Sequence, residues 1–421
     1  MKVFYDLSIH IFNWFIALAR LSGHKKATLL SAGRKETISK IVHFNTTNTN
    51  PVALFHCASL GEFEQARPVI EAWKIKYPSY KIVVSFYSPS GYEVRKKYSN
   101  ADLIVYLTSD TKHDARTFIH TLKPSVIFII KYEFWLNLLD AIKAKNIPLF
   151  LVSGVFRKKL FFFRSGGDFM RNRLHAFSHF FLQDKHSGEL LSSIGFNNWT
   201  ISGDTRFDRV HQTALATTKI PEIEIFKQDK PLLVIGSGWK EDMAVLIPFI
   251  NNFKNELKII YAPHEIHDSE MTEIEKQIEK KSIRFSAFNS SDAIASDVLI
   301  IDNIGMLSSI YGYADFAYVG GAFGSGLHNI LEPAVFGAPI FFGPKIKKFP
   351  EAAWLISLGY AKSISTTETF SQEFTAIYQS PQIKVTIQKG LQHIMLQSCG
   401  ATTSIMQKLS SDYPYLNPTN Q

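Results

Sequence analysis

The feature that most constrains the fold is an alternation of short apolar runs with helix-like segments, which occurs twice along the chain. The first series is rich in Val, Ile and Phe and comprises Val52–Phe55, Ile82–Phe86, Leu103–Leu107, Val126–Ile130, Leu149–Val152 and His179–Leu182. The second comprises Leu232–Ile235, Lys258–Tyr261, Val298–Ile301, Phe316–Val319 and Pro339–Phe342. Strands of this composition with helices between them form parallel sheets that are covered on both faces. The sequence therefore predicts an α/β protein with two Rossmann-like domains.

The length of 421 residues suits two domains and exceeds what one ordinary core holds. Residues 1–26 are expected to form a separate N-terminal helix, 27–208 the first domain, 209–230 a polar linker and 231–421 the second domain, whose last helix can pack back on the first. Two Rossmann-like domains with their parallel sheets facing a central cleft form the GT-B arrangement, with the ligand at the carboxyl ends of the strands. Epimerases and binding proteins share this architecture, so it fixes no activity.

The N-terminal segment Met1–Leu21 is apolar and aromatic, but polar residues interrupt it. Its cleanest run, Ile11–Ala19, is far shorter than the roughly 20 residues that span a bilayer, and no cleavage site of a secretory signal follows. Trp14 and Phe15, with basic residues after them, indicate a helix that lies on an anionic membrane surface. The alternative is a helix that packs on its own domain.

Charge and composition limit the partners and cofactors. The formal net charge of +9 favours anionic partners such as phosphates, nucleic acid or a membrane face. The two cysteines, Cys57 and Cys399, have no C-x-x-C context, which excludes a disulfide framework and a zinc cluster and suits a reducing cytosol. The sequence contains no D-x-D, no P-loop lysine motif and no H-E-x-x-H. We therefore expect no metal and no cofactor, and helix N-termini and basic side chains would stabilise a phosphate leaving group.

Two loops of the first half carry candidate carboxylates. Ser59 and Glu62 fit an S-x-x-E capping box. They equally fit a carboxylate at a helix N-terminus, where the dipole favours an ionised base that takes a hydroxyl proton. Glu133 and Trp135 follow the apolar strand that ends at Ile130, as a sugar-binding pair or, for Trp135, as a core residue.

Three further segments leave both structural and functional readings open. Ser90 lies in a turn, YSPSGYE, that fits an ordinary strand-to-helix connection or a phosphate or sugar contact. The segment Phe156–Arg173 combines six basic residues with three consecutive Phe, which fits nucleic acid, a solvated loop or, as we prefer, a phosphorylated glycolipid. In the second half, the turn IGSGWKED can expose backbone N–H groups to an anion, although a lone G-S-G is a weak signal.

The segment VGGAFGSGLHNILEP, Val319–Pro333, is the richest motif of the second half. Its glycines permit close backbone approach, and His328, Asn329 and Glu332 are expected on a new helix, with Asn329 and Glu332 on one face. Asn329 as a plain N-cap with Glu332 at the third helical position is the alternative. The density of glycine, histidine and carboxylate favours a nucleotide-sugar loop.

Together these loops resemble the 3-deoxy-D-manno-octulosonic acid (Kdo) transferase family, through most of the chain and least before Pro51 and after Ser365. The matching stretches are HCASLGE, SPSGYE, YLTSD, YEFWLNLL, GDTRFD, GSGWKED, IDNIGML and VGGAFGSGLHNILEPAVFGAPIFFGP. The resemblance implies an inverting, metal-independent GT-B glycosyltransferase that transfers Kdo from CMP-Kdo to a lipid A precursor in lipopolysaccharide biosynthesis. It implies that the protein acts at the cytoplasmic face of the bacterial inner membrane and has no nucleic acid as a partner. It also implies that residues 27–208 bind the acceptor and residues 231–421 bind the donor.

The resemblance also implies roles for single residues. Glu62 matches the general base. The donor-binding positions are Gly236, Ser237, Pro263, Gly305, Gly321, His328, Asn329 and Glu332, with Glu332 on the nucleotide ribose. The acceptor-binding positions are Ser59, Gly61, Ser90, Glu133, Trp135, Arg157 and Arg164.

The chain departs from the family pattern in three places, and these leave alternatives. His264 stands where the family often has Arg, Met306 where it commonly has Glu, and Lys131 and Leu136 replace the usual Glu and Pro beside Trp135. The alternative within enzymes is another GT-B glycosyltransferase, or an epimerase, that uses a UDP-sugar. The alternative outside enzymes is a protein that binds a glycolipid or a nucleotide without catalysis.

Overall fold

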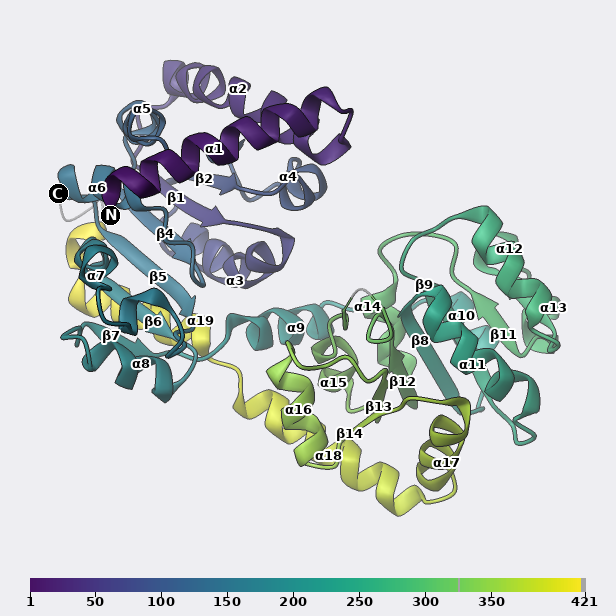
Figure 1. The fold of residues 1–421 in the computed structure, drawn as a ribbon. Helices are drawn as coiled ribbons and strands as arrows, with labels where there is room; N and C mark the ends of the chain where they lie inside the picture. Colours follow the sequence, from purple (N-terminus) through teal and green to yellow (C-terminus); the bar gives the residue numbers. More distant parts are fainter. Residues whose placement is uncertain (325, 418–421) are drawn as a thin grey trace. The chain divides into compact units, whose positions relative to one another are not determined.

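The computed structural model describes residues 1–324 and 326–417. It divides into two compact units, each built on a seven-stranded parallel sheet (Figure 1). Unit 1 comprises Met1–Arg209 together with the described residues from Ser398 onward, and unit 2 comprises Val210–Gln397.

The sheet of unit 1 has the strand order β3-β2-β1-β4-β5-β6-β7. Its strands are β1 (Val52–Cys57), β2 (Lys81–Phe86), β3 (Leu103–Tyr106), β4 (Val126–Ile130), β5 (Leu149–Gly154), β6 (His179–Leu182) and β7 (Trp199–Ile201). Its helices are α1 (Lys2–Leu21), α2 (Lys25–Thr47), α3 (Leu60–Lys76), α4 (Pro89–Arg95), α5 (Lys112–Leu122), α6 (Leu136–Ala144), α7 (Asp168–Leu174), α8 (Lys185–Ser192) and α19 (Ala401–Asp412). Helix α9 (Thr205–Leu215) crosses the boundary between the units.

Two hydrophobic cores lie on opposite faces of this sheet, because neighbouring residues of a strand point to opposite sides. On β1, Leu54 belongs to the core beneath α2, α5 and α6, whereas Phe55 belongs to the core beneath α3 and α19. All six residues of β1 are buried. The continuous apolar runs of the sequence are therefore explained by burial on both faces, as expected for a doubly wound sheet.

The sheet of unit 2 has the order β10-β11-β9-β8-β12-β13-β14. Its strands are β8 (Leu232–Gly238), β9 (Lys258–Pro263), β10 (Ser282–Arg284), β11 (Val298–Ile300), β12 (Phe316–Val319), β13 (Ile340–Phe342) and β14 (Ala361–Ser363). Its helices are α10 (Pro221–Lys227), α11 (Lys240–Asn252), α12 (Asp268–Gln277), α13 (Ser290–Ala295), α14 (Leu307–Ile310), α15 (Leu331–Phe336), α16 (Pro350–Ser357), α17 (Thr367–Tyr378) and α18 (Pro381–Gln397). The two sheets with their helices confirm the predicted α/β class of two Rossmann-like domains.

The C-terminal residues from Ser398 onward belong to unit 1, and the carboxylate of Asp208 holds the start of this segment. Asp208 accepts hydrogen bonds from the backbone N–H groups of Gly400 and Thr402, both at 2.6 Å, at the start of α19. The region expected as a linker, 209–230, holds the end of α9 and all of α10. Ile223 and Phe226 of α10 are buried, and this helix packs against α13.

Polar residues of helix α1 contact the rest of unit 1, whereas most of its apolar residues are exposed to solvent. Tyr5 donates a hydrogen bond to Asp110 at 2.5 Å, Asp6 accepts one from Asn137 at 2.8 Å, and Asn13 donates one to Ser109 at 2.6 Å. The exposed residues of the helix include Val3, Phe4, Leu7, Ile11, Trp14, Phe15, Leu18 and Leu21. Among the helices that the structure describes, none is long and apolar enough to cross a membrane.

Candidate functional site

In unit 1, the candidate base Glu62 lies in the first turn of α3, directly after the carboxyl end of β1. Ser59 is the N-cap residue, but its side chain makes no capping hydrogen bond and instead donates to Glu62 Oε2. The capping box that the S-x-x-E spacing allowed is therefore not formed. The Glu62 carboxylate therefore stands in the first turn of the helix with the Ser59 hydroxyl as its hydrogen-bond donor.

A second carboxylate, Glu133, follows the carboxyl end of the neighbouring strand β4. Burial, together with the negative charge of Glu62, raises the pKa of Glu133 to about 7. The indole N–H of Trp135 donates to Glu133 Oε2 at 2.8 Å, which opposes that rise. The two loops that carry Glu62 and Glu133 thus form one acidic centre, in which a pKa of about 7 leaves Glu133 about half protonated at neutral pH.

Aromatic stacking fixes the Glu133 loop. Trp135 stacks on Tyr87 with a ring-centroid distance of 4.7 Å, and the guanidinium of Arg34 lies 4.8 Å from the centroid of Tyr87. Trp135 also packs against the hydrophobic core while its N–H reaches Glu133. The packing agrees with the expected reading of Trp135 as a core residue, and the sugar-binding role of Glu133 and Trp135 stays a prediction.

The other acceptor candidates lie in three different loops. Gly61 is an exposed residue at the start of α3, and Ser90 is in α4, where its backbone N–H donates to Ser88 Oγ at 3.3 Å. Arg157 is exposed and its positive charge acts on Tyr132, beside Glu133, whereas Arg164 is exposed farther along the basic segment.

The three consecutive Phe of the basic segment lie mostly inside unit 1. Phe162 is buried in the core of unit 1, with Phe134 at 4.9 Å between ring centroids. Phe163 is partly buried and packs against the same core. Phe161 and Phe163 are only partly exposed, whereas Arg157, Lys158, Lys159 and Arg164 are exposed to solvent.

In unit 2, the turn after β8 is shaped for close approach. Strand β8 has an irregular register between Gly236 and Gly238, and Ser237 between them has a φ of 52°, which is rare for a residue other than glycine. A Cβ at Gly236 would lie 1.9 Å from the hydroxyl of Tyr311, so only glycine fits there.

Asp242 ties this turn to the glycine-rich segment that follows β12. Its buried carboxylate accepts hydrogen bonds from the backbone N–H of Trp239 at 3.0 Å and of Gly321 at 2.8 Å. The hydroxyl of Tyr318 donates to the same carboxylate at 2.8 Å. Burial raises the pKa of Asp242, and the three donors oppose the rise. Sequence reasoning missed this residue, although an acid at the third position of a helix after a glycine turn is a recognisable capping signal.

A pocket of about 500 Å³ lies at the carboxyl ends of β8, β9 and β11. Its lining includes the predicted donor residues Ser237, Pro263 and Gly305, together with His264. Gly305 has a φ of 100°, in the region that favours glycine. The structure therefore brings three separate predicted loops together at the edge of the sheet where parallel α/β proteins bind ligands.

Three rings stack beside this pocket and fix the protonation of His328. The indole N–H of Trp239 donates to His328 Nε2 at 3.0 Å. Because an indole nitrogen is only a donor, Nε2 must be the acceptor, and neutral His328 carries its proton on Nδ1. The ring of His264 lies 4.2 Å from that of His328. Burial, with a contribution from His264, lowers the pKa of His328 to about 4, so the ring presents an uncharged N–H at neutral pH.

Glu332 lies at the start of α15 and joins two loops. Its Oε1 accepts a hydrogen bond from Asn329 Nδ2 at 3.1 Å, and its Oε2 accepts one from Ser308 Oγ at 3.0 Å. Our expectation that His328 and Asn329 lie on the new helix was wrong, because α15 begins at Leu331 with Ile330 as N-cap. Both residues stand in the loop before the helix, where they are held by Trp239 and Glu332.

The residues that the structure describes contain no group of three or more His, Cys, Asp or Glu side chains that could hold a metal ion. Ser308 and Trp239 also escaped prediction, because each acts through a contact to a residue far away in the sequence. Only the fold brings Trp239 to His328 and Ser308 to Glu332.

Comparison with known proteins finds similarity to transferases of one kind. Residues 33–209 match the family model described as 3-deoxy-D-manno-octulosonic-acid transferase (kdotransferase). The chain is 27% identical over 356 residues to the 3-deoxy-D-manno-octulosonic acid transferase of Chlamydophila psittaci, covering 81% of each chain. It is 24% identical over 390 residues to the transferase of the same name from Haemophilus influenzae, covering 88% of this chain and 89% of that one.

Solved structures show the same fold. A putative UDP-N-acetylglucosamine 2-epimerase from Listeria monocytogenes matches with a TM-score of 0.59 at 13% identity, over 87% of this chain and 98% of its own. MurG of Acinetobacter baumannii matches with a TM-score of 0.55 at 13% identity, over 85% of this chain and 98% of its own. Identities this low show the fold alone, which is the GT-B class. The family model over residues 33–209 and the relatives over most of the chain show that it is similar to 3-deoxy-D-manno-octulosonic acid transferases, and the chain is a glycosyltransferase.

Proposed function

We propose that the chain transfers Kdo, with inversion and without a metal ion, from CMP-Kdo to a lipid A precursor, and that Glu62 is the general base. Similarity to these transferases supports Kdo transfer in lipopolysaccharide biosynthesis. The observation that carries the catalytic assignment is the state of Glu62. Glu62 follows the carboxyl end of β1, and its side chain forms no capping hydrogen bond with the backbone. It accepts a hydrogen bond from the hydroxyl of Ser59.

The chemical step moves one proton and exchanges one bond. Glu62 takes the proton of an acceptor sugar hydroxyl, and the oxygen of that hydroxyl forms a bond to the anomeric carbon of Kdo. The bond between this carbon and the phosphate oxygen breaks on the opposite side, and CMP leaves with the electron pair. The proton stays on Glu62 until it passes to solvent. Neighbouring Glu133, which is about half protonated near pH 7, spares Glu62 the repulsion of a second full negative charge.

For the donor, we propose that the pocket lined by Ser237, Pro263 and Gly305 holds the nucleotide. A carboxylate has about four acceptor positions, so Glu332 can accept ribose hydroxyls in addition to Ser308 and Asn329. Developing charge on the leaving phosphate would be met by the N-terminus of α11 and by uncharged donors such as His328 Nδ1–H. The metal-independent assignment rests on the absence of a D-x-D motif from the sequence.

For the acceptor, we propose that Ser90, Trp135 and the exposed Arg157 and Arg164 contact the phosphorylated sugar. The outward apolar face of α1 would hold the protein on the membrane that contains the lipid. We place this membrane contact at the cytoplasmic face of the bacterial inner membrane, where the nucleotide donor is made available.

The testing experiment incubates the full-length protein with CMP-Kdo and a lipid A precursor in the presence of EDTA, followed by mass spectrometry of the lipid. The proposal predicts the added mass of Kdo. A lipid of unchanged mass would contradict it. Competition of cytidine against uridine nucleotides for binding separates CMP-Kdo from the alternative of a UDP-sugar, because the proposal requires CMP to bind more tightly than UMP.

A further inference from the structure

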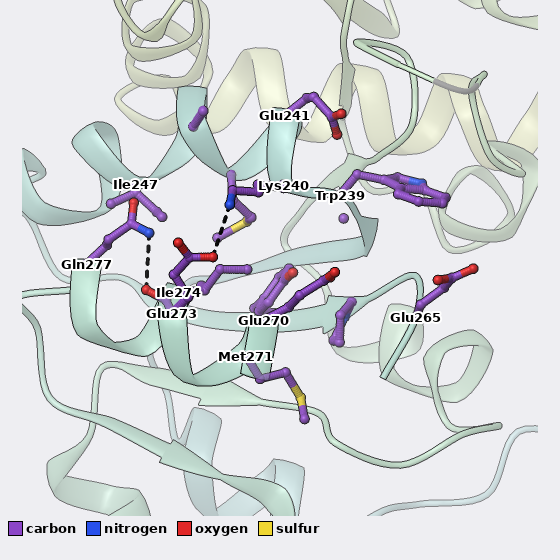
Figure 2. A pocket seen from close by; sticks show the side chains of 15 residues that line it. Trp239, Lys240, Glu241, Ile247, Glu265, Glu270, Met271, Glu273, Ile274 and Gln277 are labelled. Carbon is purple, nitrogen blue, oxygen red and sulfur yellow. Dashed lines mark hydrogen bonds and ion pairs between the residues drawn. The ribbon is translucent and has the colours of Figure 1, made fainter. Parts of the chain in front are cut away.

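Unit 2 contains a second cavity, of about 300 Å³, between α11 and α12 (Figure 2). It shares Pro263 and Glu265 with the pocket at the strand ends, but residues of α11 and α12 form most of its lining. The side chains of Met243, Ile247 and Met271 line it and are buried. The volume is at the lower end of the range for small-molecule sites.

The rim of this cavity is acidic although the chain as a whole is basic. Four glutamates line it: Glu241, Glu265, Glu270 and Glu273. Lys240 is the one basic residue of the lining, and it is bound by Glu273 at 3.0 Å. Neither Glu241 nor Glu270 forms an ion pair with any residue that the structure describes. Four carboxylates and one ammonium give the lining a formal charge of about −3, which favours a cationic ligand.

A tyrosine hydroxyl on the cavity lining has no hydrogen-bond partner among the described residues. Tyr261 lines the cavity from β9 and is only 2% exposed. Its hydroxyl makes no hydrogen bond to any residue within 1–324 or 326–417. By contrast, the hydroxyl of Tyr318, which lies in register with Tyr261 on β12 beyond the intervening strand β8, donates to Asp242. A tyrosine hydroxyl can both donate and accept hydrogen bonds, so the Tyr261 hydroxyl on the cavity lining is a contact that a ligand can complete. Burial and the charges of Asp242 and Glu270 keep this hydroxyl protonated by raising its pKa.

We propose that this cavity binds an aliphatic amine of the polyamine class. The alkyl chain would cover the Met and Ile side chains of the floor, and the ammonium groups would meet Glu241 and Glu270. One ammonium N–H would donate to the oxygen of Tyr261. The class follows from the combination of an apolar floor, a negative rim and an unsatisfied hydroxyl, because a bare metal ion would leave the floor without a partner.

The test is a titration of the full-length protein with spermidine at 0.15 M ionic strength, followed by NMR of ¹³C-labelled methionine methyl groups. The chain has seven methionines, and Met243 and Met271 are the two in the cavity. The proposal predicts saturable shifts confined to these two methyl groups. Absence of these shifts, or equal shifts when MgCl₂ replaces spermidine at the same ionic strength, would overturn it.

Two variants and a control make the test specific. Tyr261→Phe keeps the ring and removes the hydroxyl, and loss of a hydrogen bond to a charged group is expected to weaken spermidine binding by about tenfold or more. Glu270→Gln should weaken it as well. Glu279→Gln removes the same charge just beyond the end of α12, outside the cavity, and should leave the affinity unchanged. If the control weakens binding as much as Glu270→Gln, only the overall charge attracts the amine and the site is refuted.

Discussion

Replacement of Phe4, Trp14 and Phe15 by serine tests whether the outward face of α1 binds a membrane. These side chains are 72%, 59% and 57% exposed. Aromatic side chains offer about 150–250 Å² each, so the three rings together expose roughly 380 Å² of mostly apolar surface. If about half of this area leaves water on a bilayer, ~25 cal/mol per Å² gives ~5 kcal/mol, or a several-thousandfold change in the partition coefficient. Because the rings are exposed, their loss should leave the fold intact.

The assay is co-sedimentation of the full-length protein with vesicles of anionic phospholipid. We expect the triple variant to bind at least about a hundredfold more weakly. This lower bound applies if the rings insert less deeply than the half burial used above. The matched control replaces three exposed apolar residues outside α1, Ile75, Leu215 and Leu396, by serine and should bind as the unaltered protein does. Unchanged vesicle affinity of the α1 variant, with an unchanged melting temperature, would refute the reasoning.

Three further predictions concern the candidate site. Glu133 has its pKa raised from 4.5 to about 7, so the folded protein holds more protons than the unfolded chain between these values and loses stability as the pH rises through them. Urea unfolding of Glu133→Gln should therefore show a smaller loss of unfolding free energy from pH 4.5 to 7. Trp239→Phe keeps the stacked ring but removes the donor to His328, and calorimetry should show CMP binding weakened by about three- to tenfold, whereas unchanged affinity would show that the tautomer of His328 does not matter. Gly320→Ala places a Cβ 2.2 Å from the Ser237 carbonyl oxygen, and thermal unfolding should show a cost of roughly 1–3 kcal/mol, whereas at Gly324 the nearest contact is an ordinary 3.7 Å and alanine should be tolerated.

The central strands could be predicted from the sequence because burial on both faces demands unbroken apolar runs. Strand β6 has the predicted bounds, His179–Leu182. The edge strands β7, β10 and β14 were missed, because each has only three residues and includes polar ones such as Thr200, Ser282 and Lys362. An edge strand pairs with a neighbour on one side only and needs no run of apolar residues. The amino-acid composition of these segments therefore does not predict a strand.

In the candidate site, the sequence also predicts the loops but not the contacts between residues that lie far apart in the chain. The loops could be found because each follows a predicted strand, and the structure gathers Ser237, Pro263 and Gly305 at one pocket. The partners of these loops could not be found, because they depend on contacts across the fold, such as the bond between Trp239 and His328. Local patterns also misled where one spacing fits two structures. The S-x-x-E spacing allows a capping box, yet the hydroxyl of Ser59 bonds to the carboxylate itself.

Transfer by the Glu62→Gln variant tests the central claim most directly. The protein is incubated with CMP-Kdo and a lipid A precursor, Kdo-modified lipid is quantified by mass spectrometry, and CMP binding is measured on the same preparation. Loss of a general base costs about 10²- to 10⁴-fold in rate, so we predict that product formation falls by this factor while CMP affinity is retained. The control Glu36→Gln, which removes an exposed carboxylate of α2 that pairs with Lys40, should transfer Kdo normally. Normal turnover by Glu62→Gln would contradict the assignment of Glu62 as the base.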